Sequence, residues 1–480
     1  MYPYCPKLLL LYALTVIAAL PGSVSGQEAD RYIPRKTYGS DDREMMSSLR
    51  AQMLDEVSTI TSKRKSQVLQ VYSERTNYLI EGIREGAFIK DDSLQAVIDS
   101  VVKRLLRSNT LKHQPKQVLI LKSSLPNASC YGEGTFIVSV GLLSRLDNES
   151  QLAFTMAHEL AHYELEHMKT RILLEVETKF SKNVKSEITK ILTDDDATLQ
   201  RVDSARKLMY GLGRFSRRME QEADSLGYLF FRNAGYRQTE IATLLSILDS
   251  AEFPKYRVDL FKPFHLAKYP FQDYWLKQRP RVFSKKVDNV FIFSNDSLSS
   301  HPDIAQRKAR LAGFMDTVSD PKNFVESPSF QRAVRMAEFE SVQAAFFSKQ
   351  YDRALFLSLQ LAGNHPHHNY LVSMIARILA ITAEAKESRM FAALVPSYTG
   401  HYSEELRQVN NFLHNLTVDE AGELAFNFLN NQANFDPSEE EHYLLLWKIC
   451  GLTHRNQVQE KVKATYRAKF PKGKFLSMMK

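Results

Sequence analysis

The sequence predicts a mainly helical protein with a small β-sheet in its first part and a wholly helical second part. Long stretches of the first part repeat apolar residues with the 3.6-residue period of a helix. Two short runs, residues 117–121 and 135–140, are rich in β-branched and other apolar residues and indicate buried strands. After about Pro328 only the helical period remains. A chain of 480 residues with 44% hydrophobic content is long enough for two or three domains with large cores.

The N-terminal segment, residues 1–26, has the features of a secretory signal peptide. Lys7 precedes an apolar core over residues 8–20, and Pro21 and small residues follow that core. The core is shorter than the roughly 20 residues that a membrane-spanning helix needs, and no later segment is apolar for long enough. We therefore expect a soluble exported protein, in the periplasm as first choice and secreted as second. An uncleaved membrane anchor is the alternative.

After the signal segment, two stretches have helical periodicity, at residues 41–83 and 91–108. The strand at 117–121 follows them, and a turn-rich link with two glycines, residues 127–134, leads into the strand at 135–140. This order predicts a small sheet with helices packed against it.

The next helix is predicted to begin at Asn148, because Asn148 and Gln151 have the spacing of a capping box. Alanines recur every four residues along it and form a small-residue stripe that allows close packing. Residues 170–213 are charged and rich in helical pattern, and we interpret them as an insertion. Residues 253–300 are a candidate lid, because aromatic residues among the prolines favour an ordered segment over a disordered linker.

The helical second part, residues 329–480, is predicted to be a tetratricopeptide-like repeat domain. Tyr351, Ala354 and Pro366 have the spacing of the second half of such a repeat. The same Ala-to-Pro interval recurs between Ala425 and Pro437, whereas the other signature positions are not matched. We expect two or three helical hairpins in a short solenoid, with an unrelated helical cap as the alternative.

The main candidate for chemistry is the sequence His158-Glu159-Leu160-Ala161-His162, on the helix that follows Asn148. Residues four apart lie on one face of a helix, so His158 and His162 can share one Zn²⁺ ion. Glu159 beside them is then the candidate general base. Because so short a motif also occurs by chance, it requires a third ligand elsewhere in the chain.

A catalytic zinc site needs three protein ligands and one open position. One class of site places a third histidine ten residues after the first, but that position is Met168, which excludes the class. His167 is out of register and is interpreted as a surface residue. A glutamate from a separate helix is the other common solution, and Glu220 is favoured over the remaining candidates, which are Glu175, Glu177, Glu187 and Glu222.

Asp224 is the reason for preferring Glu220 as the third ligand. It follows four residues later on the same helical face, where its carboxylate can accept a hydrogen bond from the outer nitrogen of a ligand imidazole. Ala223 and Gly227 keep this face small enough to approach the His158 helix closely. A surface Glu/Asp pair on an amphipathic helix is the alternative.

Together these motifs resemble metallopeptidase family forty-eight, the group that includes HtpX and the CAAX prenyl endopeptidases. The resemblance runs from about residue 65 to 312 and rests on motifs in the family's order, which are Asn127-Ala128, residues 136–138 and 141–143, residues 158–162, Ser216-Arg217, Glu220 with Ala223-Asp224, and His301-Pro302 with Arg307. It implies a gluzincin-type α+β peptidase domain over residues 27–328. It also implies one Zn²⁺ per chain, held by His158, His162 and Glu220.

The resemblance also gives roles to His301 and Arg307, which spacing alone does not select. In the family, the matching histidine lies beside the metal, where it binds the oxyanion or occupies the open zinc position and keeps the enzyme inactive. Arg307 is then expected to support the loop of His301 or the substrate carbonyl. The signal segment, the lack of spanning segments and the helical tail resemble the periplasmic family member BepA more than HtpX.

The expected function is that of an exported zinc metalloendopeptidase in which Glu159 assists the attack of zinc-bound water on a peptide bond. The expected substrates are unfolded or misassembled envelope proteins, bound as an added strand against Thr135, Phe136, Ile137 and Val138. The alternative is an envelope assembly or chaperone factor that binds a protein partner through its helical tail and has latent protease activity gated by His301.

Charge and cysteine content exclude other classes. The net charge of +8 does not come from a dense Lys/Arg run or from interleaved basic and aromatic residues, so nucleic acid is not an expected partner. Peripheral contact with an anionic membrane surface stays open. Cys130 and Cys450 are the only cysteines after the signal segment, which excludes a disulfide framework, and free thiols are favoured over one disulfide.

Overall fold

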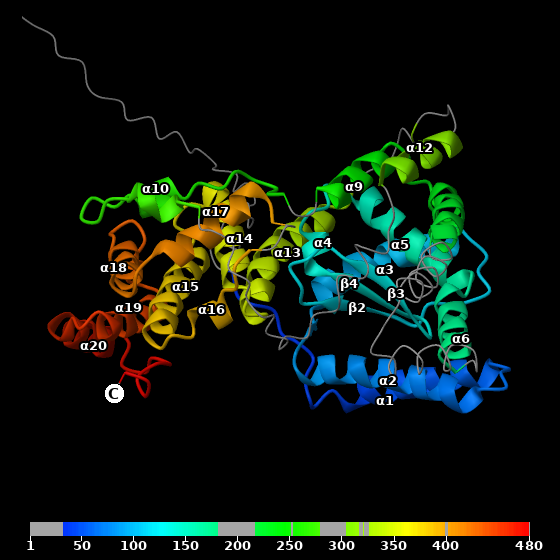
Figure 1. Cartoon of the computed structure of the whole chain (residues 1–480), viewed down its shortest axis with the longest axis horizontal. Coiled ribbons are helices and arrows are strands. Elements are labelled where there is room, and N and C mark those ends of the chain that lie inside the picture. The colour runs from blue at the N-terminus through cyan, green and yellow to red at the C-terminus, as the bar shows by residue number, and fades with distance from the viewer. Residues whose placement is uncertain are drawn as a thin grey trace, which may run out of the picture.

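The computed structural model describes residues 32–180, 217–250, 253–278, 304–315, 320, 326–398 and 402–479. The expected signal segment, His301 and most of the expected insertion lie outside these residues. Figure 1 shows a part that contains the sheet and a part made of helices alone, next to each other along the longest axis. The fold class is confirmed, because the described chain is mainly helical with one small sheet.

The sheet has four strands in the order β1-β2-β4-β3. Their bounds are β1 (Phe88–Ile89), β2 (Gln117–Leu121), β3 (Ala128–Gly132) and β4 (Thr135–Ser139). β2 and β4 run parallel, whereas β1 and β3 pair antiparallel with β2 and β4, respectively. The two predicted strands are therefore present as β2 and β4, and β3 lies wholly within the predicted turn-rich link.

β3, and not β4, is the edge strand of the sheet. β4 pairs with β2 on one side and with β3 on the other, and all five of its residues are buried. The physical reason is a tight hairpin, in which Gly132, Glu133 and Gly134 have φ angles of 115°, 49° and 83° and turn the chain back onto β4. The prediction that a substrate strand adds to an open edge is therefore wrong for Thr135, Phe136, Ile137 and Val138.

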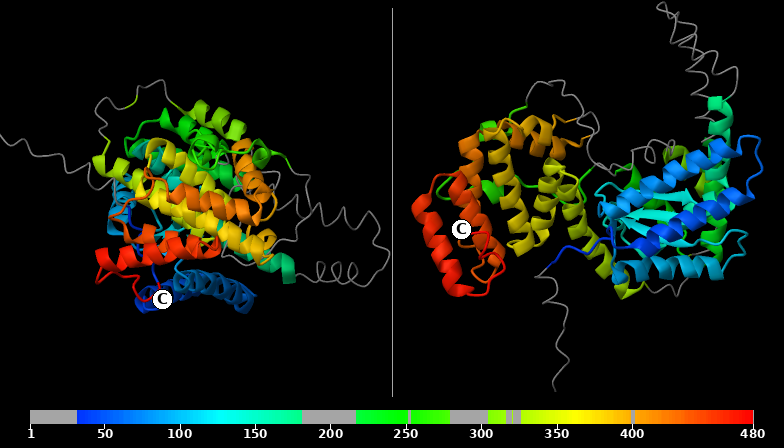
Figure 2. Two further views of the ribbon diagram at one scale, coloured as in Figure 1. Left: turned by 90° about the vertical axis from the view of Figure 1, so that its left-hand side faces the viewer. Right: turned by 90° about the horizontal axis from the view of Figure 1, so that it is seen from below.

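Helices cover both faces of the sheet (Figures 1 and 2). One face carries α1 (Arg43–Thr59) and α2 (Lys65–Arg84), and the other carries α3 (Asp92–Arg107) and α5 (Glu149–Glu164). The strand side chains alternate between these two layers. Leu119 of β2 packs with α1 and α2, whereas its neighbour Ile120 packs with α3 and α5.

The long helical pattern predicted at residues 41–83 forms two helices, α1 and α2, instead of one. Ile60 ends α1 by taking an extended conformation with ψ 123°. Its side chain is buried between the two helices with Val57 of α1 and Val68 of α2. The break therefore lets the two helices pack against each other as well as against the sheet.

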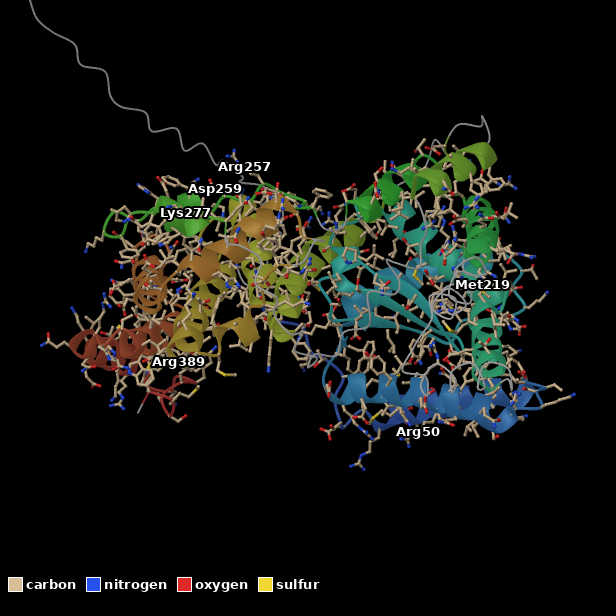
Figure 3. All side chains as sticks on the ribbon, in the orientation of Figure 1. Arg50, Met219, Arg257, Asp259, Lys277 and Arg389 are labelled. Atoms are coloured by element: carbon tan, nitrogen blue, oxygen red, sulfur yellow. The ribbon has the colours of Figure 1, made fainter. Side chains whose placement is uncertain are left out.

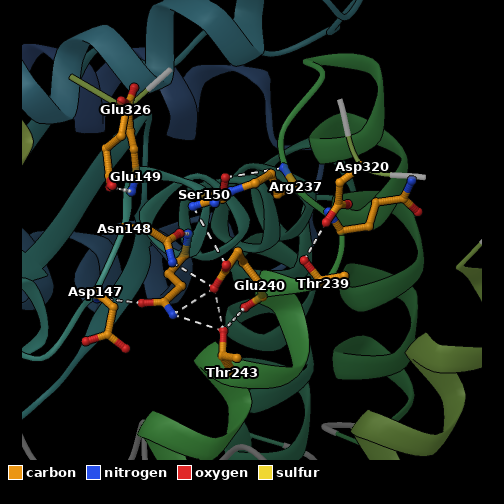
Figure 4. A network of polar contacts seen from close by, with 12 residues as sticks. Asp147, Asn148, Glu149, Ser150, Arg237, Thr239, Glu240, Thr243, Asp320 and Glu326 are labelled. Carbon is orange, nitrogen blue, oxygen red and sulfur yellow. Dashed lines mark hydrogen bonds and ion pairs between the residues drawn. The ribbon is translucent and has the colours of Figure 1, made fainter. Parts of the chain in front are cut away.

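α5 begins at the predicted cap, and a polar network holds its first turn. The Asn148 Oδ1 atom accepts a hydrogen bond from the Gln151 N–H at 3.1 Å. The Gln151 Oε1 atom accepts from the N–H of Asp147 at 2.7 Å, so the second bond of the predicted capping box goes to Asp147 instead of Asn148. Figure 4 shows that Asn148 also donates to Glu240 of α9 (Glu240–Asp249), at 2.7 Å. This network fixes the helix that carries the two histidines.

The helical part contains α13 (Pro328–Phe347), α14 (Tyr351–Asn364), α15 (Asn369–Glu387), α16 (Phe391–Leu394), α17 (Glu404–Asn415), α18 (Val418–Leu429), α19 (Glu440–Leu452) and α20 (Asn456–Lys469). α13 belongs to two cores. Phe330 and Ala333 pack with residues of α3 and α5, whereas Val342 and Ala345 pack with the helices that follow. The predicted boundary at residue 328 thus falls at the start of a helix that both parts share, and the repeat character of the tail stays a prediction. None of the described helices is long and apolar enough to cross a membrane.

The described half of the candidate lid, residues 253–278, packs against the helical part. It contains α10 (Phe261–Phe264) and the short 3₁₀ helix η1 (Asp273–Leu276). Phe264 stacks on Phe412 of α17 with ring centroids 5.1 Å apart, and Trp275 is completely buried in the same core. These aromatic residues therefore form part of that core instead of a cover over His158.

Candidate active site

Two histidines and a glutamate converge at the middle of the sheet-containing part. His158 and His162 lie one turn apart on α5, and their Nε2 atoms are 3.1 Å apart. Glu220 comes from the helix described over residues 217–233, on which Figure 3 labels the neighbouring Met219. Its two carboxylate oxygens lie 3.4 Å from the Nε2 atoms of His158 and His162, respectively. Among the residues that the structure describes, no other group of side chains is arranged to hold a metal ion.

These three side chains fit a four-coordinate zinc ion. Ligand atoms placed at about 2.0–2.1 Å from a tetrahedral zinc lie about 3.3 Å from one another. The separations between the donor atoms are 3.1–3.4 Å. Two imidazoles and one carboxylate are also a donor set of catalytic zinc sites, which keep a fourth position open. Their role as ligands stays a prediction that this geometry supports.

Gly227 allows the Glu220 helix to approach α5. A Cβ atom at Gly227 would lie 3.0 Å from both the Cα and the N atom of His158, and 3.1 Å from the carbonyl oxygen of Ala157. These are backbone atoms of a buried helix, so they cannot move aside cheaply. The close contact brings Glu220, two turns earlier on the same helix, within reach of both histidines.

Asp224 lies behind His158, as the sequence analysis expects. Its Oδ1 atom is 3.0 Å from the Nδ1 atom of His158, on the side of the ring away from the three donor atoms. Arg307 of α12 (Ile304–Phe314) donates two hydrogen bonds to the same carboxylate, at 3.0 and 2.7 Å, and Arg310 donates a third at 3.3 Å. Asp224 therefore links the orientation of His158 to α12.

The surroundings of His158 favour a positive charge on its imidazole ring. Burial alone lowers the pKa of His158, but the hydrogen bonds and charges of Asp224 and Glu220 outweigh it and raise the pKa to about 10. Burial likewise acts to raise the pKa of Asp224, but His158 and Arg307 hold the pKa of this carboxyl well below its usual range. The buried, ionised carboxylate of Asp224 behind His158 therefore favours a cation at this site.

Glu159 is positioned by the edge strand. Its Oε2 atom accepts a hydrogen bond from the main-chain N–H of Cys130, in the middle of β3, at 2.6 Å. Glu159 is buried, with 6% of its surface exposed. The candidate base thus lies between the metal-site face of α5 and the free edge of the sheet. Cys130 itself is buried and free, as is Cys450.

Sequence reasoning missed the place of His167. This residue is buried, not on the surface, with 6% of its surface exposed. Its Nδ1 atom lies 2.9 Å from the Nδ1 atom of His162. Burial first, and the charge of His162 second, lower the pKa of His167 to about 4, so the ring is neutral near pH 7. No helical spacing in the sequence predicts this contact, because the chain turns between the two residues.

Two further expectations concern Arg307 and His301. The guanidinium of Arg307 is buried against Asp224, behind His158, and its expected support of the loop of His301 or of the substrate carbonyl stays a prediction. The buried carboxylate of Asp224 needs a positive charge beside it, and the planar guanidinium of Arg307 supplies this charge with two parallel hydrogen bonds. His301 lies outside the described residues, so its expected place beside the metal stays a prediction.

Comparisons with known proteins agree with this site. Residues 92–314 match the family described as Peptidase family M48. Over 120 residues the chain is 29% identical to the mitochondrial metalloendopeptidase OMA1 of Arabidopsis thaliana, which covers 25% of this chain and 23% of the relative. Over 183 residues it is 25% identical to the beta-barrel assembly-enhancing protease of Escherichia coli (strain K12), which covers 37% of each chain.

The relative named mitochondrial metalloendopeptidase OMA1 in Schizosaccharomyces pombe is 28% identical over 156 residues, which are 32% of this chain and 44% of the relative. The chain thus matches less than half the length of each of these relatives. The family match contains α3, the whole sheet except β1, α5, the Glu220 helix and α12, and so every described residue of the site. Residues 92–314 form a metallopeptidase domain of family M48.

Proposed function

We propose that this chain is an exported zinc metalloendopeptidase that acts on unfolded or misassembled proteins. The observation that carries the proposal is the convergence of His158, His162 and Glu220, with Glu159 held beside them by β3. A zinc ion held by His158, His162 and Glu220 would polarise a substrate carbonyl and lower the pKa of water. Glu159 would act as general base toward a water molecule and then as general acid toward the leaving amine.

The free edge of β3 is the proposed place for the substrate. Within the described residues, β3 is one of the two terminal strands of the sheet, and no strand pairs with its outer edge. An extended peptide can add to such an edge through main-chain hydrogen bonds, which select for unfolded chain over folded protein. Since Glu159 already contacts the N–H of Cys130, a peptide bond at this edge would lie close to the base.

The test compares the wild-type protein with Glu159→Gln. Metal content is measured by mass spectrometry and cleavage is measured on casein, an unfolded protein. We expect one zinc per chain in both proteins and a loss of cleavage of at least about 100-fold in Glu159→Gln, which is the usual contribution of a general base. Equal cleavage by the two proteins would refute the mechanism, and absence of zinc from the wild type would refute the site.

Export is the part of the proposal that concerns the N-terminal segment. The signal-like segment at residues 1–26 supports it, whereas two of the relatives are named as mitochondrial proteins. N-terminal sequencing of the mature protein from fractionated cells tests it. We expect a periplasmic protein that begins near Gln27; a protein that retains Met1 in the cytoplasmic fraction would contradict export.

A second candidate function, binding of a protein partner by the helical part, is favoured by one cavity. It has a volume of about 490 Å³ and lies between residues 256–266 and helices α14, α15 and α18. Val372, Ile375 and Phe428 contribute apolar surface to its lining, in which Arg257 and Lys262 outnumber the one carboxylate, that of Asp259. The volume is in the range of ligand sites, about 300–1,000 Å³. Such a lining suits an acidic, partly apolar peptide segment.

A deletion that starts at residue 330 does not test this role, because it would remove α13 residues from the core of the peptidase domain. The charge reversals Arg257→Glu and Lys262→Glu, made together in the Glu159→Gln protein, leave both cores intact. The readout is suppression of aggregation of a reduced, unfolded test protein. The matched control reverses the exposed residues Lys268 and Lys277, the latter labelled with Arg257 and Asp259 in Figure 3. Loss of suppression in both pairs, or in neither, would contradict a role for the cavity.

A further inference from the structure

The outer nitrogen of His162 meets a second imidazole instead of a carboxylate. His158 has Asp224 behind its ring, at 3.0 Å. His162 has no carboxylate in this position among the described residues; its Nδ1 atom faces the Nδ1 atom of His167, at 2.9 Å. The two rings are steeply inclined, with an interplanar angle of 72°. Two nitrogen atoms at this distance form a hydrogen bond only if one of them carries the proton.

A break between two helices places His167 there. On a continuous helix a residue five positions later lies about 140° around the axis, so it would point away from His162. The chain does not continue in this way, because α5 ends at Glu164 and Glu166 takes a left-handed conformation with φ 53°. α6 (His167–Phe180) begins at the next residue, and its first side chain turns back against His162. A non-glycine residue rarely adopts this conformation, so the surrounding structure must hold Glu166 in it.

A metal ion on His162 would leave only one arrangement of protons. If the Nε2 atom of His162 holds a metal ion, the proton of this ring is on Nδ1. The Nδ1–H group of His162 then donates to the bare Nδ1 atom of His167, and the proton of His167 is on its Nε2 atom. That Nε2 atom lies 3.4 Å from the Oε2 atom of Glu222, which can accept its N–H. The other oxygen of Glu222 accepts a hydrogen bond from Arg218 at 2.8 Å.

The two candidate histidine ligands are therefore backed in parallel ways. Behind His158 lies Asp224, which in turn contacts Arg307. Behind His162 lies His167, which contacts Glu222, and Glu222 contacts Arg218. Each series ends in an arginine and holds its ligand imidazole in the tautomer with a bare Nε2 atom. The first series is fully buried, whereas the second reaches the surface, where the Glu222 side chain is 42% exposed.

We propose that His167 is a positioning residue, which fixes the tautomer and ring orientation of His162 through its Nδ1 atom and is itself oriented by Glu222. The inference rests on the proposed zinc site, because it assigns His167 a role toward a ligand of that site. It differs from simple packing in one respect: a side chain that accepts one hydrogen bond and donates another can replace His167, but an apolar side chain of similar size cannot.

The experiment compares His167→Gln, which keeps one acceptor and one donor atom, with His167→Leu, which keeps neither. The matched control is His113→Leu, since His113 is a nearby histidine whose ring contacts Glu166 and Tyr163. Zinc affinity is measured on purified apoprotein by competition with a chelating dye, and the absorption spectrum is recorded with Co²⁺ in place of zinc. Neither readout depends on peptidase activity.

We expect His167→Leu to bind zinc about 10–100-fold more weakly and to change the Co²⁺ bands, because outer partners of ligand histidines contribute that much. His167→Gln and His113→Leu should stay close to the wild type. Wild-type affinity in His167→Leu, or an equal loss in His167→Gln, would refute the inference. A wild-type protein that binds neither metal would instead refute the proposed function, so the two failures are distinguishable.

A second variant covers the case in which His167→Leu does not fold. Glu222→Leu removes the acceptor at the surface end of the series without changing a buried residue. If His167 acts through this carboxylate, Glu222→Leu weakens zinc binding less than His167→Leu would but shifts the Co²⁺ bands in the same direction. An unchanged Co²⁺ spectrum in Glu222→Leu would refute the part assigned to Glu222.

Discussion

At the scale of single residues, the site depends on buried charges that are stable only as ion pairs. Asp224 is completely buried and contacts one imidazole and two guanidinium groups. Arg307 is also buried, with 4% of its surface exposed. Breaking a buried ion pair by removing one partner costs more than the pair contributes, because the remaining charge loses both water and its partner.

Asp224→Asn should therefore have two effects. It should destabilise the fold by about 3–5 kcal/mol, since Arg307 keeps its charge without a counter-charge. It should also weaken zinc binding about 10–100-fold, since an amide accepts less strongly from His158 and can present its N–H instead. Urea unfolding and dye competition measure the two effects. The control is Asp249→Asn, at an exposed position, whose stability should stay close to that of the wild type. An equally small change in Asp224→Asn would contradict this account.

The burial of the Glu133 carboxyl predicts that the stability of the fold depends on pH. It is buried in the β3–β4 hairpin, its Oε1 atom has no hydrogen-bond partner, and burial raises its pKa from 4.5 to about 7. The folded state thus binds this proton more tightly than the unfolded state, so stability is lost as pH rises between these two values. The shift corresponds to about 3 kcal/mol.

Glu133→Gln should remove this penalty, since glutamine stays neutral. We expect the variant to be more stable than the wild type at pH 8 and equal to it near pH 4.5, as measured by urea unfolding at both values. The exposed Glu85→Gln should show no such pH-dependent difference. A difference between wild type and Glu133→Gln that is the same at both pH values would contradict the assigned pKa.

At the scale of elements, the contact between α5 and the Glu220 helix determines the site. Gly227→Ala should separate these helices, because the added methyl group would lie 3.0 Å from the backbone of His158. We expect lower stability and weaker zinc binding. Gly313→Ala is a matched control within a helix, since no atom lies within 4 Å of its Cβ position. That control should gain up to about 1 kcal/mol from helix propensity. A gain of stability in Gly227→Ala as well would show that the helix contact is looser than described.

The elements also show how far sequence reasoning reaches in this chain. α5, its cap at Asn148 and the facing of His158 and His162 follow from local spacing, because helix periodicity and capping are local. Asp224 behind His158 follows from the same kind of spacing, together with the chemistry of zinc ligands. Local pattern fails where a few residues with positive φ redirect the chain. The hairpin at Glu133 makes β3 the edge strand, and the turn at Glu166 brings His167 inward.

At the scale of the whole molecule, α13 makes the two parts depend on each other. Phe330 is buried in the core shared with α3 and α5, and Val342 is buried in the core of the helical part. The N-terminal segment adds to this connection, because Tyr32 and the N–H of Arg35 both donate to the buried carboxylate of Glu340 on α13. Residues 36–38 then continue along β1, through the N–H of Tyr38 and the carbonyl of Phe88 at 2.9 Å.

We therefore predict one cooperative unfolding transition in calorimetry. Phe330→Ala should lower the free energy of unfolding by about 3–5 kcal/mol and Val342→Ala should lower it by about 2 kcal/mol, because each loses buried apolar surface. Both variants should move the same transition, whereas Arg335→Ala, on the exposed side of α13, should leave it unchanged. Two separate transitions, of which Phe330→Ala moves only one, would contradict a shared core.

The hydrogen bond from Cys130 to Glu159 bears on how this site tolerates mutation over evolutionary time. Its donor is a main-chain N–H group, which every residue except proline has. A substitution of Cys130 by any residue other than proline therefore keeps the donor. The thiol at position 130 is therefore free to drift toward any residue that fits its buried space, while the carboxylate keeps its anchor. By contrast, His162 depends on side chains at 167 and 222, which a single codon change can replace. The two sides of the site should therefore accumulate substitutions at unequal rates.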